Sequence, residues 1–236
     1  ALAILGEPER LPRALVLEPT RELAAQVEEN LVKYGKYLPL NYALLHGGVS
    51  IGPQKERLRK GADIVVATPG RLIDLLEQRC LSLENIEYLV LDEVDRMLDM
   101  GFIEDVARIV NQCPVKRQTL LFSATIPETI RRLASWALHQ PIEINAGSRH
   151  TPAETVDHCI YPVDAIQKYD LLTSLLEKED YKSAIIFTRT KRDADHITDW
   201  LIAHNYAVTA MHADRSQKER QQALEAEVDD LTEKIA

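Results

Sequence analysis

The sequence predicts an α/β protein built on parallel sheets, and three observations support this prediction. Short apolar runs rich in β-branched residues alternate with longer stretches in which apolar residues recur at three- and four-residue intervals. The short runs are nearly continuous in apolar character, which is typical of strands covered on both faces. After a loose polar segment the alternation begins again. We therefore expect two α/β units in tandem.

The first unit is expected to span residues 1–146. Its predicted strands are Ala14–Leu17, Tyr42–His46, Ile64–Ala67, Tyr88–Asp92, Thr119–Phe122 and Ile142–Ile144. Its clearest helical patterns are Arg21–Tyr37, Gly70–Glu77, Ile103–Asn111 and Glu128–Leu138. In an open parallel sheet, ligands bind at the carboxyl ends of the strands. Functional residues are therefore expected directly after these strands.

A linker is expected at residues 147–155, in a stretch that contains glycine, serine and proline. The second unit is then expected at residues 156–236, where the pattern stops after three strands. Its predicted strands are Val156–Tyr161, Ala184–Thr188 and Val208–Met211. Its predicted helices are Ala165–Leu176, Lys191–His204 and Ser216–Ala226. The acidic end, Glu225–Ala236, has helical spacing but no assigned role.

The composition is that of a globular protein. Of 236 residues, 45% are hydrophobic and 28% are charged, which provides enough apolar material for a core. The net charge of −9 argues against nucleic-acid binding through a broad basic surface, although local phosphate contacts remain possible. The scattered Cys80, Cys113 and Cys159 are expected to be free thiols in a reducing compartment. With no apolar run long enough for a membrane span and no signal peptide, a cytoplasmic protein is expected.

The strongest chemical signal is the apolar run Leu89–Leu91 followed by two carboxylates, Asp92 and Glu93. This Walker-B arrangement delivers both acids to the carboxyl end of a strand. The first acid can hold the Mg²⁺ that bridges nucleotide phosphates, and the second can orient and deprotonate an attacking water. Taken alone, the pattern is equally compatible with an acidic strand end at the surface.

The residues that follow decide between these interpretations. The run from Asp92 to Phe102, DEVDRMLDMGF, resembles the signature of the DEAD-box ATP-dependent RNA helicases, with Val94 in place of alanine. This resemblance implies tandem RecA-like domains, each a three-layer α/β/α structure with a parallel sheet. It also implies ATP and Mg²⁺ as cofactors and RNA as the partner, bound through its backbone with little sequence specificity. It implies no membrane partner and leaves protein partners unknown.

Further motifs of the family follow in the expected order. Pro19-Thr20-Arg21-Glu22-Leu23-Ala24 opens a helix after a strand and matches motif Ia. Gly47-Gly48 resembles the GG element, and Thr68-Pro69-Gly70-Arg71 resembles motif Ib, in which proline suits the first helical position. Ser123-Ala124-Thr125 matches the SAT motif, which couples hydrolysis to unwinding in the family. In the second unit, Ile185–Lys191 resembles motif IV. Met211–Arg220 resembles the segment H-G-D…S-Q-x-x-R, with Ala213 in place of glycine.

The resemblance assigns roles residue by residue. The catalytic group comprises Asp92, which also serves as the metal ligand through the nucleotide, together with Glu93, Asp95, Ser123 and Thr125. The RNA-binding group comprises Pro19, Thr20, Arg21, Gly47, Gly48, Thr68, Pro69, Gly70, Arg71, Arg189, Thr190, Gln217 and Arg220.

The 236 residues contain no G-x-x-x-x-G-K-[ST] segment to cradle phosphates. The first domain is therefore expected to lack its N-terminal part, the second to be truncated, and the piece alone to be inactive as an ATPase. The alternative is a naturally shortened, non-catalytic module that binds RNA or a partner protein. An unrelated α/β nucleotide-binding enzyme would explain the alternation of elements but not the ordered motifs.

Overall fold

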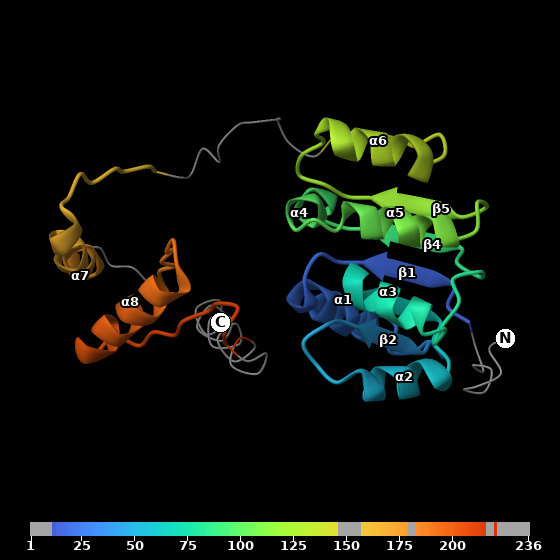
Figure 1. Ribbon diagram of the computed structural model, residues 1–236, viewed down its shortest axis with the longest axis horizontal. Helices are drawn as coiled ribbons and strands as arrows, with labels where there is room; N and C mark the ends of the chain where they lie inside the picture. Colours follow the sequence, from blue (N-terminus) through green and yellow to red (C-terminus); the bar gives the residue numbers. More distant parts are fainter. Residues whose placement is uncertain (1–10, 146–156, 179–182, 216–219, 221–236) are drawn as a thin grey trace. The chain divides into compact units, whose positions relative to one another are not determined.

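A computed structural model of the chain describes residues 11–145, 157–178, 183–215 and 220 (Figure 1). The chain divides into two compact units, Ala1–Glu143 and Ile144–Ala236, and each is described by itself below.

The first unit is built on a five-stranded sheet with the strand order β2-β3-β1-β4-β5 (Figure 1). All neighbouring strands pair in parallel. The strands are β1 (Ala14–Leu17), β2 (Tyr42–Leu45), β3 (Ile64–Ala67), β4 (Tyr88–Leu91) and β5 (Gln118–Leu121). Among the described residues, β2 and β5 form the two edges of this sheet.

The register of these pairings makes the strands end level with one another. Leu17 of β1 is paired with Ala67 of β3 on one side and with Leu91 of β4 on the other. Ala67 is also paired with Leu45, and Leu91 with Leu121. The residue after each strand therefore lies at the same edge of the sheet, the carboxyl edge.

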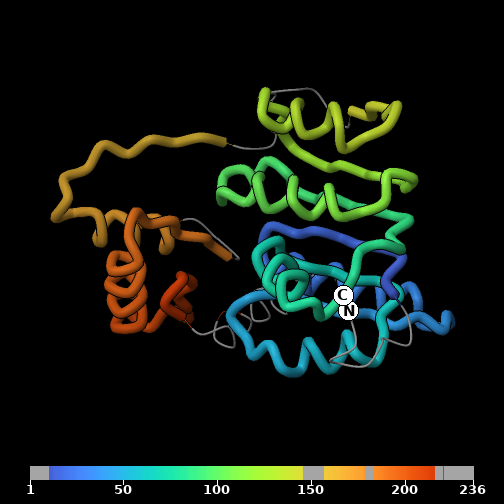
Figure 2. Tube along the Cα trace, turned by 45° about the vertical axis from the view of Figure 1, so that its right-hand side comes forward, coloured from blue at the N-terminus to red at the C-terminus, as the bar shows by residue number. Residues whose placement is uncertain are grey.

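Helices connect the strands. They are α1 (Arg21–Tyr34), α2 (Ile51–Arg59), α3 (Pro69–Glu77), α4 (Val94–Asp99), α5 (Ile103–Gln112) and α6 (Glu128–Ala137). In Figures 1 and 2, α3 and α5 lie side by side, consistent with the contacts between these two helices. The connection through α1 runs towards β2, whereas those through α3 and α5 run towards β5. Because such crossovers are right-handed, α1 covers the opposite face of the sheet from α3 and α5.

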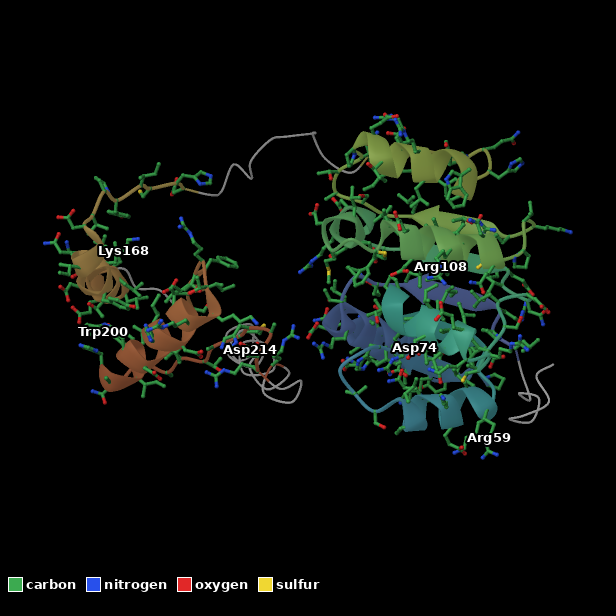
Figure 3. All side chains as sticks on the ribbon, in the orientation of Figure 1. Arg59, Asp74, Arg108, Lys168, Trp200 and Asp214 are labelled. Atoms are coloured by element: carbon green, nitrogen blue, oxygen red, sulfur yellow. The ribbon has the colours of Figure 1, made fainter. Side chains whose placement is uncertain are left out.

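Apolar burial holds the unit together. Leu15, Leu89 and Leu91 are fully buried in the sheet, and Leu72 and Ile109 are buried beneath α3 and α5. Burial of such a side chain contributes roughly 1.5–3 kcal/mol. By contrast, the ion pair of 2.7 Å that joins Arg108 on α5 to Glu77 on α3 is exposed on both sides, and such pairs contribute at most about 1 kcal/mol (Figure 3). Packing, and not surface charge, therefore determines the fold.

The predicted elements of the first unit agree with the structure to within a few residues, with three exceptions. Helix α2 was not expected, because Gly52 and Pro53 interrupt its pattern, but proline is tolerated in the first helical turn. Helix α4 has only six residues, too few to show a period. The strand expected at Ile142–Ile144 is wrong: these residues pair with no strand, and both isoleucine side chains are exposed, so nothing stabilises a strand there.

The second unit contains the 3-10 turn η1 (Ala165–Gln167) and the helices α7 (Lys168–Lys178) and α8 (Lys191–Ala203). The rings of Tyr169 on α7 and Trp200 on α8 lie 5.4 Å apart, and that of His204 lies 4.3 Å from Trp200 (Figure 3). The contact between Tyr169 and Trp200 joins the two helices, whereas that between Trp200 and His204 lies at the C-terminal end of α8. Helix α8 corresponds to the predicted helix Lys191–His204.

The strands predicted in the second unit are wrong for the part that the structure describes. Residues 157–161, Ala184–Thr188 and Val208–Met211 form no ladder, and the side chains of Ile160 and Phe187 are 94% and 92% exposed. A strand requires a neighbouring strand that satisfies its backbone groups, and within the described residues these segments pair with none. Val156, the linker 147–155 and the end 225–236 lie outside the described residues, as does the helix Ser216–Ala226 apart from Arg220.

Two polar side chains are buried among the described residues, those of Glu18 and Gln54. Glu18 directly follows β1 and is 1% exposed, and its Oε1 has no hydrogen-bond partner within the described part of the chain. Burial disfavours the ionised carboxylate, and the negative charges of Asp92 and Glu93 add to this effect. Together they raise the pKa of Glu18 to about 7.

Replacement of Glu18 by glutamine should stabilise the protein increasingly as the pH rises. The folded state raises the pKa of Glu18 from 4.5 to about 7, so the wild type loses stability between these two values as the carboxyl ionises. Glu18→Gln imitates the neutral form. One pKa unit corresponds to about 1.4 kcal/mol. The gain in unfolding free energy from Glu18→Gln should therefore grow from about 1 kcal/mol at pH 5 to about 3 kcal/mol at pH 8.

Urea unfolding across this pH range measures the gain. Glu104→Gln, at an exposed position on α5, is the matched control and should change stability by no more than about 0.5 kcal/mol. A gain from Glu18→Gln that does not vary with pH would contradict the raised pKa.

Candidate active site and nucleic-acid interface

The carboxyl edge of the sheet brings together the predicted site residues of the first unit. Asp92 and Glu93 follow β4, and Ser123 and Thr125 follow β5 by two and four residues. On the other half of the edge, the motif residues follow β1, β2 and β3: Pro19, Thr20, Arg21, Gly47, Gly48, Thr68, Pro69, Gly70 and Arg71. Helices α1 and α3 begin at this edge, and the N-terminus of a helix favours a negatively charged ligand.

The backbone fixes the acidic pair. The amide of Asp92 donates to the carbonyl oxygen of Leu17 at 3.1 Å, which anchors the end of β4 to β1. The amide of Glu93 donates to Oδ1 of Asp92 at 2.9 Å. Glu93 has φ 45° and ψ 52°, the left-handed conformation, which is uncommon for residues with a side chain and stores about 1–3 kcal/mol of strain. Such strain is frequent at functional sites.

The side chain of Glu93 forms an ion pair with Arg96, with Oε2 and Nη1 3.0 Å apart. Both side chains are partly exposed, so the pair is weak and a ligand can displace it. The carboxylate of Glu93 is therefore held at the surface of the carboxyl edge without being locked there.

Asp95 connects helix α4 to the loop after β5. Its Oδ2 accepts hydrogen bonds from the amide and the hydroxyl of Thr125, at 2.8 and 3.0 Å. Its amide donates to Oγ of Ser123 at 3.2 Å, and the Ser123 hydroxyl donates to the carbonyl oxygen of Thr125 at 2.6 Å. Burial acts to raise the pKa of Asp95, but the hydrogen bonds from Thr125 and Ser123 outweigh it and lower that pKa. The three residues form one network.

The half of the edge formed by β1, β2 and β3 contains two arginines around a glycine loop. Gly48 has φ +76°, and a Cβ atom at this position would clash with Nη1 of Arg21, so the guanidinium packs directly on the glycine. At the next residue of the loop, Nη2 of Arg71 donates to the carbonyl oxygen of Val49 at 3.1 Å. Only glycine allows this backbone conformation and this close approach together.

The motif residues at the helix N-termini have local roles. Oγ1 of Thr20 accepts from the amide of Leu23 at 3.3 Å and caps α1. Thr68 caps α3 without a side-chain hydrogen bond, and Pro69 is its first residue. A Cβ atom at Gly70 would meet only open space, so this glycine leaves the start of α3 accessible.

In the second unit, Thr190 caps α8 by accepting from the amide of Asp193 at 3.1 Å, and Arg189 is exposed beside it. Gln217 lies outside the described residues, and Arg220 is a described residue of the second unit.

The turn that includes Ala213 is tied to α8. Oδ1 of Asp195 lies 3.0 Å from Nε2 of His212 and accepts from Nη2 of Arg215 at 2.7 Å. The hydrogen bond with His212 is the main cause of the lowered pKa of Asp195. Neither Glu18 nor Asp195 was recognised from the sequence as a site neighbour. The sequence signal that could have identified Glu18 is an acidic residue directly after an apolar run.

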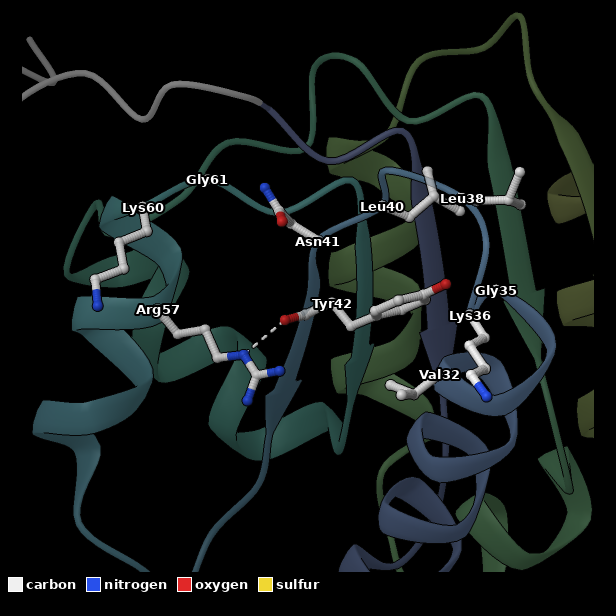
Figure 4. A pocket seen from close by; sticks show the side chains of 10 residues that line it. All are labelled: Val32, Gly35, Lys36, Leu38, Leu40, Asn41, Tyr42, Arg57, Lys60 and Gly61. Atoms are coloured by element: carbon white, nitrogen blue, oxygen red, sulfur yellow. Dashed lines mark hydrogen bonds between the residues drawn. The ribbon is translucent and has the colours of Figure 1, made fainter.

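A shallow pocket of about 430 Å³ lies elsewhere, near the amino ends of β2 and β3 (Figure 4). Arg57, one of its lining residues, donates to the carbonyl oxygen of Tyr42 at 2.7 Å and lies 3.2 Å from Glu28. The pocket is thus at the opposite edge of the sheet from the predicted site residues of the first unit, and its arginine already has partners.

No helix in the described part of the chain combines the length and the apolar composition that a membrane crossing requires. Within the same residues, no group of three or more histidine, cysteine, aspartate or glutamate side chains is placed to hold a metal ion by itself.

Comparison with known proteins supports the motif assignment. Residues 1–133 match the family model described as DEAD/DEAH box helicase, and residues 167–229 match the helicase conserved C-terminal domain. The chain is 42% identical over 218 residues to "ATP-dependent RNA helicase DeaD" of Mycobacterium tuberculosis, covering 92% of this chain and 38% of the relative. It is 40% identical over 212 residues to "DEAD-box ATP-dependent RNA helicase CshA" of Streptococcus pneumoniae, covering 90% and 40%. It is 44% identical over 216 residues to "DEAD-box ATP-dependent RNA helicase 14" of Arabidopsis thaliana, covering 90% and 35%.

The chain thus spans 35 to 40% of the length of these relatives. The first family model covers more than half of the chain, and the motifs that carry the resemblance lie together at one edge of the sheet. The chain belongs to the DEAD/DEAH box helicase family.

Proposed function

We propose that the chain is part of an ATP-dependent RNA helicase, in which RNA-stimulated hydrolysis of ATP drives local unwinding or remodelling of RNA duplexes. One observation carries the proposal: the carboxyl edge holds an acidic pair after β4 and, after β1, β2 and β3, a glycine loop that Arg21 and Arg71 both contact. The first half has the chemistry for phosphoryl transfer and the second for binding a phosphate backbone. The relatives are named as ATP-dependent RNA helicases, which agrees with a site that combines these two chemistries.

The proposal divides the chain as the sequence suggested. Residues 1–146 form the ATP-binding domain, residues 147–155 the linker and residues 156–236 the beginning of the C-terminal domain. The two family models support this division, because they match residues 1–133 and 167–229 separately. The free cysteines suit a reducing compartment, and we place the protein in the cytoplasm.

In the proposed mechanism, Mg²⁺ bound to the phosphates of ATP neutralises their charge, and Asp92 would hold it. Mg²⁺ commonly takes one or two carboxylates and completes its shell with phosphate oxygens and water, so a single carboxylate at this edge fits. Glu93 would orient the attacking water and accept its proton as the water oxygen bonds to the terminal phosphorus; the bond from that phosphorus to the bridging oxygen breaks, and ADP leaves with that oxygen. The weak ion pair with Arg96 holds the Glu93 carboxylate at the carboxyl edge until ATP arrives.

The network of Asp95, Ser123 and Thr125 would couple conformational changes at the nucleotide site to the RNA-binding half of the edge. Their network joins the helix that starts beside Glu93 to the loop after β5. A shift of Glu93 on hydrolysis would therefore move α4 and this loop together. The network is a contiguous physical connection, which is the requirement for such coupling.

RNA would lie across β1, β2 and β3 and contact the edge with its sugar–phosphate backbone. Arg21 and Arg71 supply charge, the N-termini of α1 and α3, at Pro19-Thr20 and Thr68-Pro69-Gly70, supply the positive ends of helix dipoles, and Gly47-Gly48 allow close approach. Arg189, Thr190, Gln217 and Arg220 would contribute from the second domain. A local site of this kind is compatible with the net charge of −9.

A second candidate follows from the absence of a G-x-x-x-x-G-K-[ST] segment in the 236 residues. A chain of only these residues would bind RNA or a partner protein without hydrolysing ATP. Measurements of RNA binding and of hydrolysis separate the two candidates.

RNA binding should depend on Arg21 and Arg71 and fall steeply with salt. In fluorescence anisotropy with a labelled oligouridine, Arg21→Gln and Arg71→Gln should each weaken binding about tenfold, and each should lower the slope of log K against log salt by about 1. The matched control is Arg59→Gln, which removes an exposed arginine at the far end of α2 (Figure 3). Equal effects of all three substitutions would show that only net charge matters.

ATP hydrolysis should require a phosphate loop in addition to Glu93. With RNA and Mg-ATP, phosphate release by the 236-residue chain should equal that of its Glu93→Gln variant. A longer chain that supplies G-x-x-x-x-G-K-[ST] ahead of Ala1 should hydrolyse ATP, and Glu93→Gln should reduce its rate at least about 100-fold because the proton acceptor is lost. Hydrolysis by the 236 residues above the Glu93→Gln level would overturn this prediction.

A further inference from the structure

Gln54 is the second buried polar side chain among the described residues, and it belongs to none of the family motifs. It lies on α2 and is 8% exposed. Its Oε1 accepts from the amide of His46 at 3.2 Å, and its Nε2 donates to the carbonyl oxygen of His46 at 3.1 Å. The side-chain amide thus pairs with both backbone groups of His46, as a neighbouring strand would pair with the end of β2.

These hydrogen bonds lie at the two ends of the glycine loop. His46 immediately precedes Gly47-Gly48, and Nε2 of Gln54 also donates to the carbonyl oxygen of Ser50 at 3.4 Å, where the loop enters α2. The middle of the loop is flanked by Arg21 at Gly48 and by Arg71 at Val49. Gln54 therefore holds the ends of a loop whose centre lies between the two arginines that are proposed to bind RNA.

A purely structural role would not require glutamine. An apolar side chain could fill the same space beneath α2, and burying an amide is unfavourable unless its hydrogen bonds are made. All three hydrogen bonds of Gln54 go to the loop 46–50, and none goes to another helix. The polar side chain is thus explained by the loop.

We propose that Gln54 is a positioning residue for RNA binding, which holds the loop 46–50 in its binding conformation before RNA arrives. This inference rests on the proposed function. Without Gln54 the loop, with its two adjacent glycines, would sample other conformations, and the apparent affinity falls in proportion to the competent fraction. If that fraction drops to about one tenth, RNA binding weakens about tenfold.

The test compares Gln54→Met with the wild type in oligouridine binding by fluorescence anisotropy. Methionine has a similar length but forms none of the hydrogen bonds, so binding should weaken about tenfold while helicity is kept. Amide hydrogen exchange at Gly47 and Gly48 should become faster. Gln112→Met, which alters an exposed glutamine on α5, is the matched control and should leave both quantities unchanged. If Gln54→Met does not fold, Gln54→Glu replaces it, since it keeps the acceptor for the His46 amide and should give a smaller loss.

A double-mutant cycle with Gly48→Ala separates positioning from general destabilisation. Alanine at the left-handed Gly48 would by itself distort the loop, so adding Gln54→Met should then cost little further affinity. Additive losses, or unchanged RNA affinity in Gln54→Met, would overturn the inference and leave the proposed function standing. Absence of salt-dependent RNA binding by the wild type would instead overturn the proposed function, and this inference with it.

Discussion

The level pairing of parallel strands is the constraint on which the first unit depends. The last residues of neighbouring strands are paired in register, so the residues that follow the five strands are brought to one edge. The pairing is possible only because the strands are covered on both faces, so the buried leucines, valines and isoleucines determine where the polar residues lie. A shift of one strand by one residue would reverse its faces and also move its motif off the edge.

This edge has an electrostatic asymmetry. Asp92 and Glu93 follow β4 on one side, and Glu18 follows the neighbouring β1; burial, and then the charges of Asp92 and Glu93, raise the pKa of Glu18. The β2 and β3 side of the edge presents Arg21 and Arg71, with helix N-termini beside them. A polyanion is therefore steered towards the second side, whereas the first requires a cation between its carboxylates and any phosphate. In the proposed function, one sheet edge would thus separate two ligands that are both rich in phosphate.

The sequence was sufficient for the five strands of the sheet and for most helices of the first unit, because these have a clear apolar period, but it wrongly suggested a further strand at Ile142–Ile144. It was insufficient for the second unit, where Ala184–Thr188 and Val208–Met211 have strand-like composition but no pairing partner in the described residues. The motif residues were found because a short pattern carries them. Glu18 and Gln54 were missed, because the burial of Glu18 depends on the neighbouring strands and that of Gln54 on a weakly apolar helix interrupted by Gly52 and Pro53.

The left-handed backbone of Glu93 places chemistry and thermostability in opposition. Glycine and asparagine adopt this conformation at little cost, so either would relieve strain at this position. Neither can accept a proton as a carboxylate does. In the proposed mechanism, a selection only for heat resistance would therefore tend to remove this glutamate, whereas a selection for turnover would have to retain a strained backbone conformation.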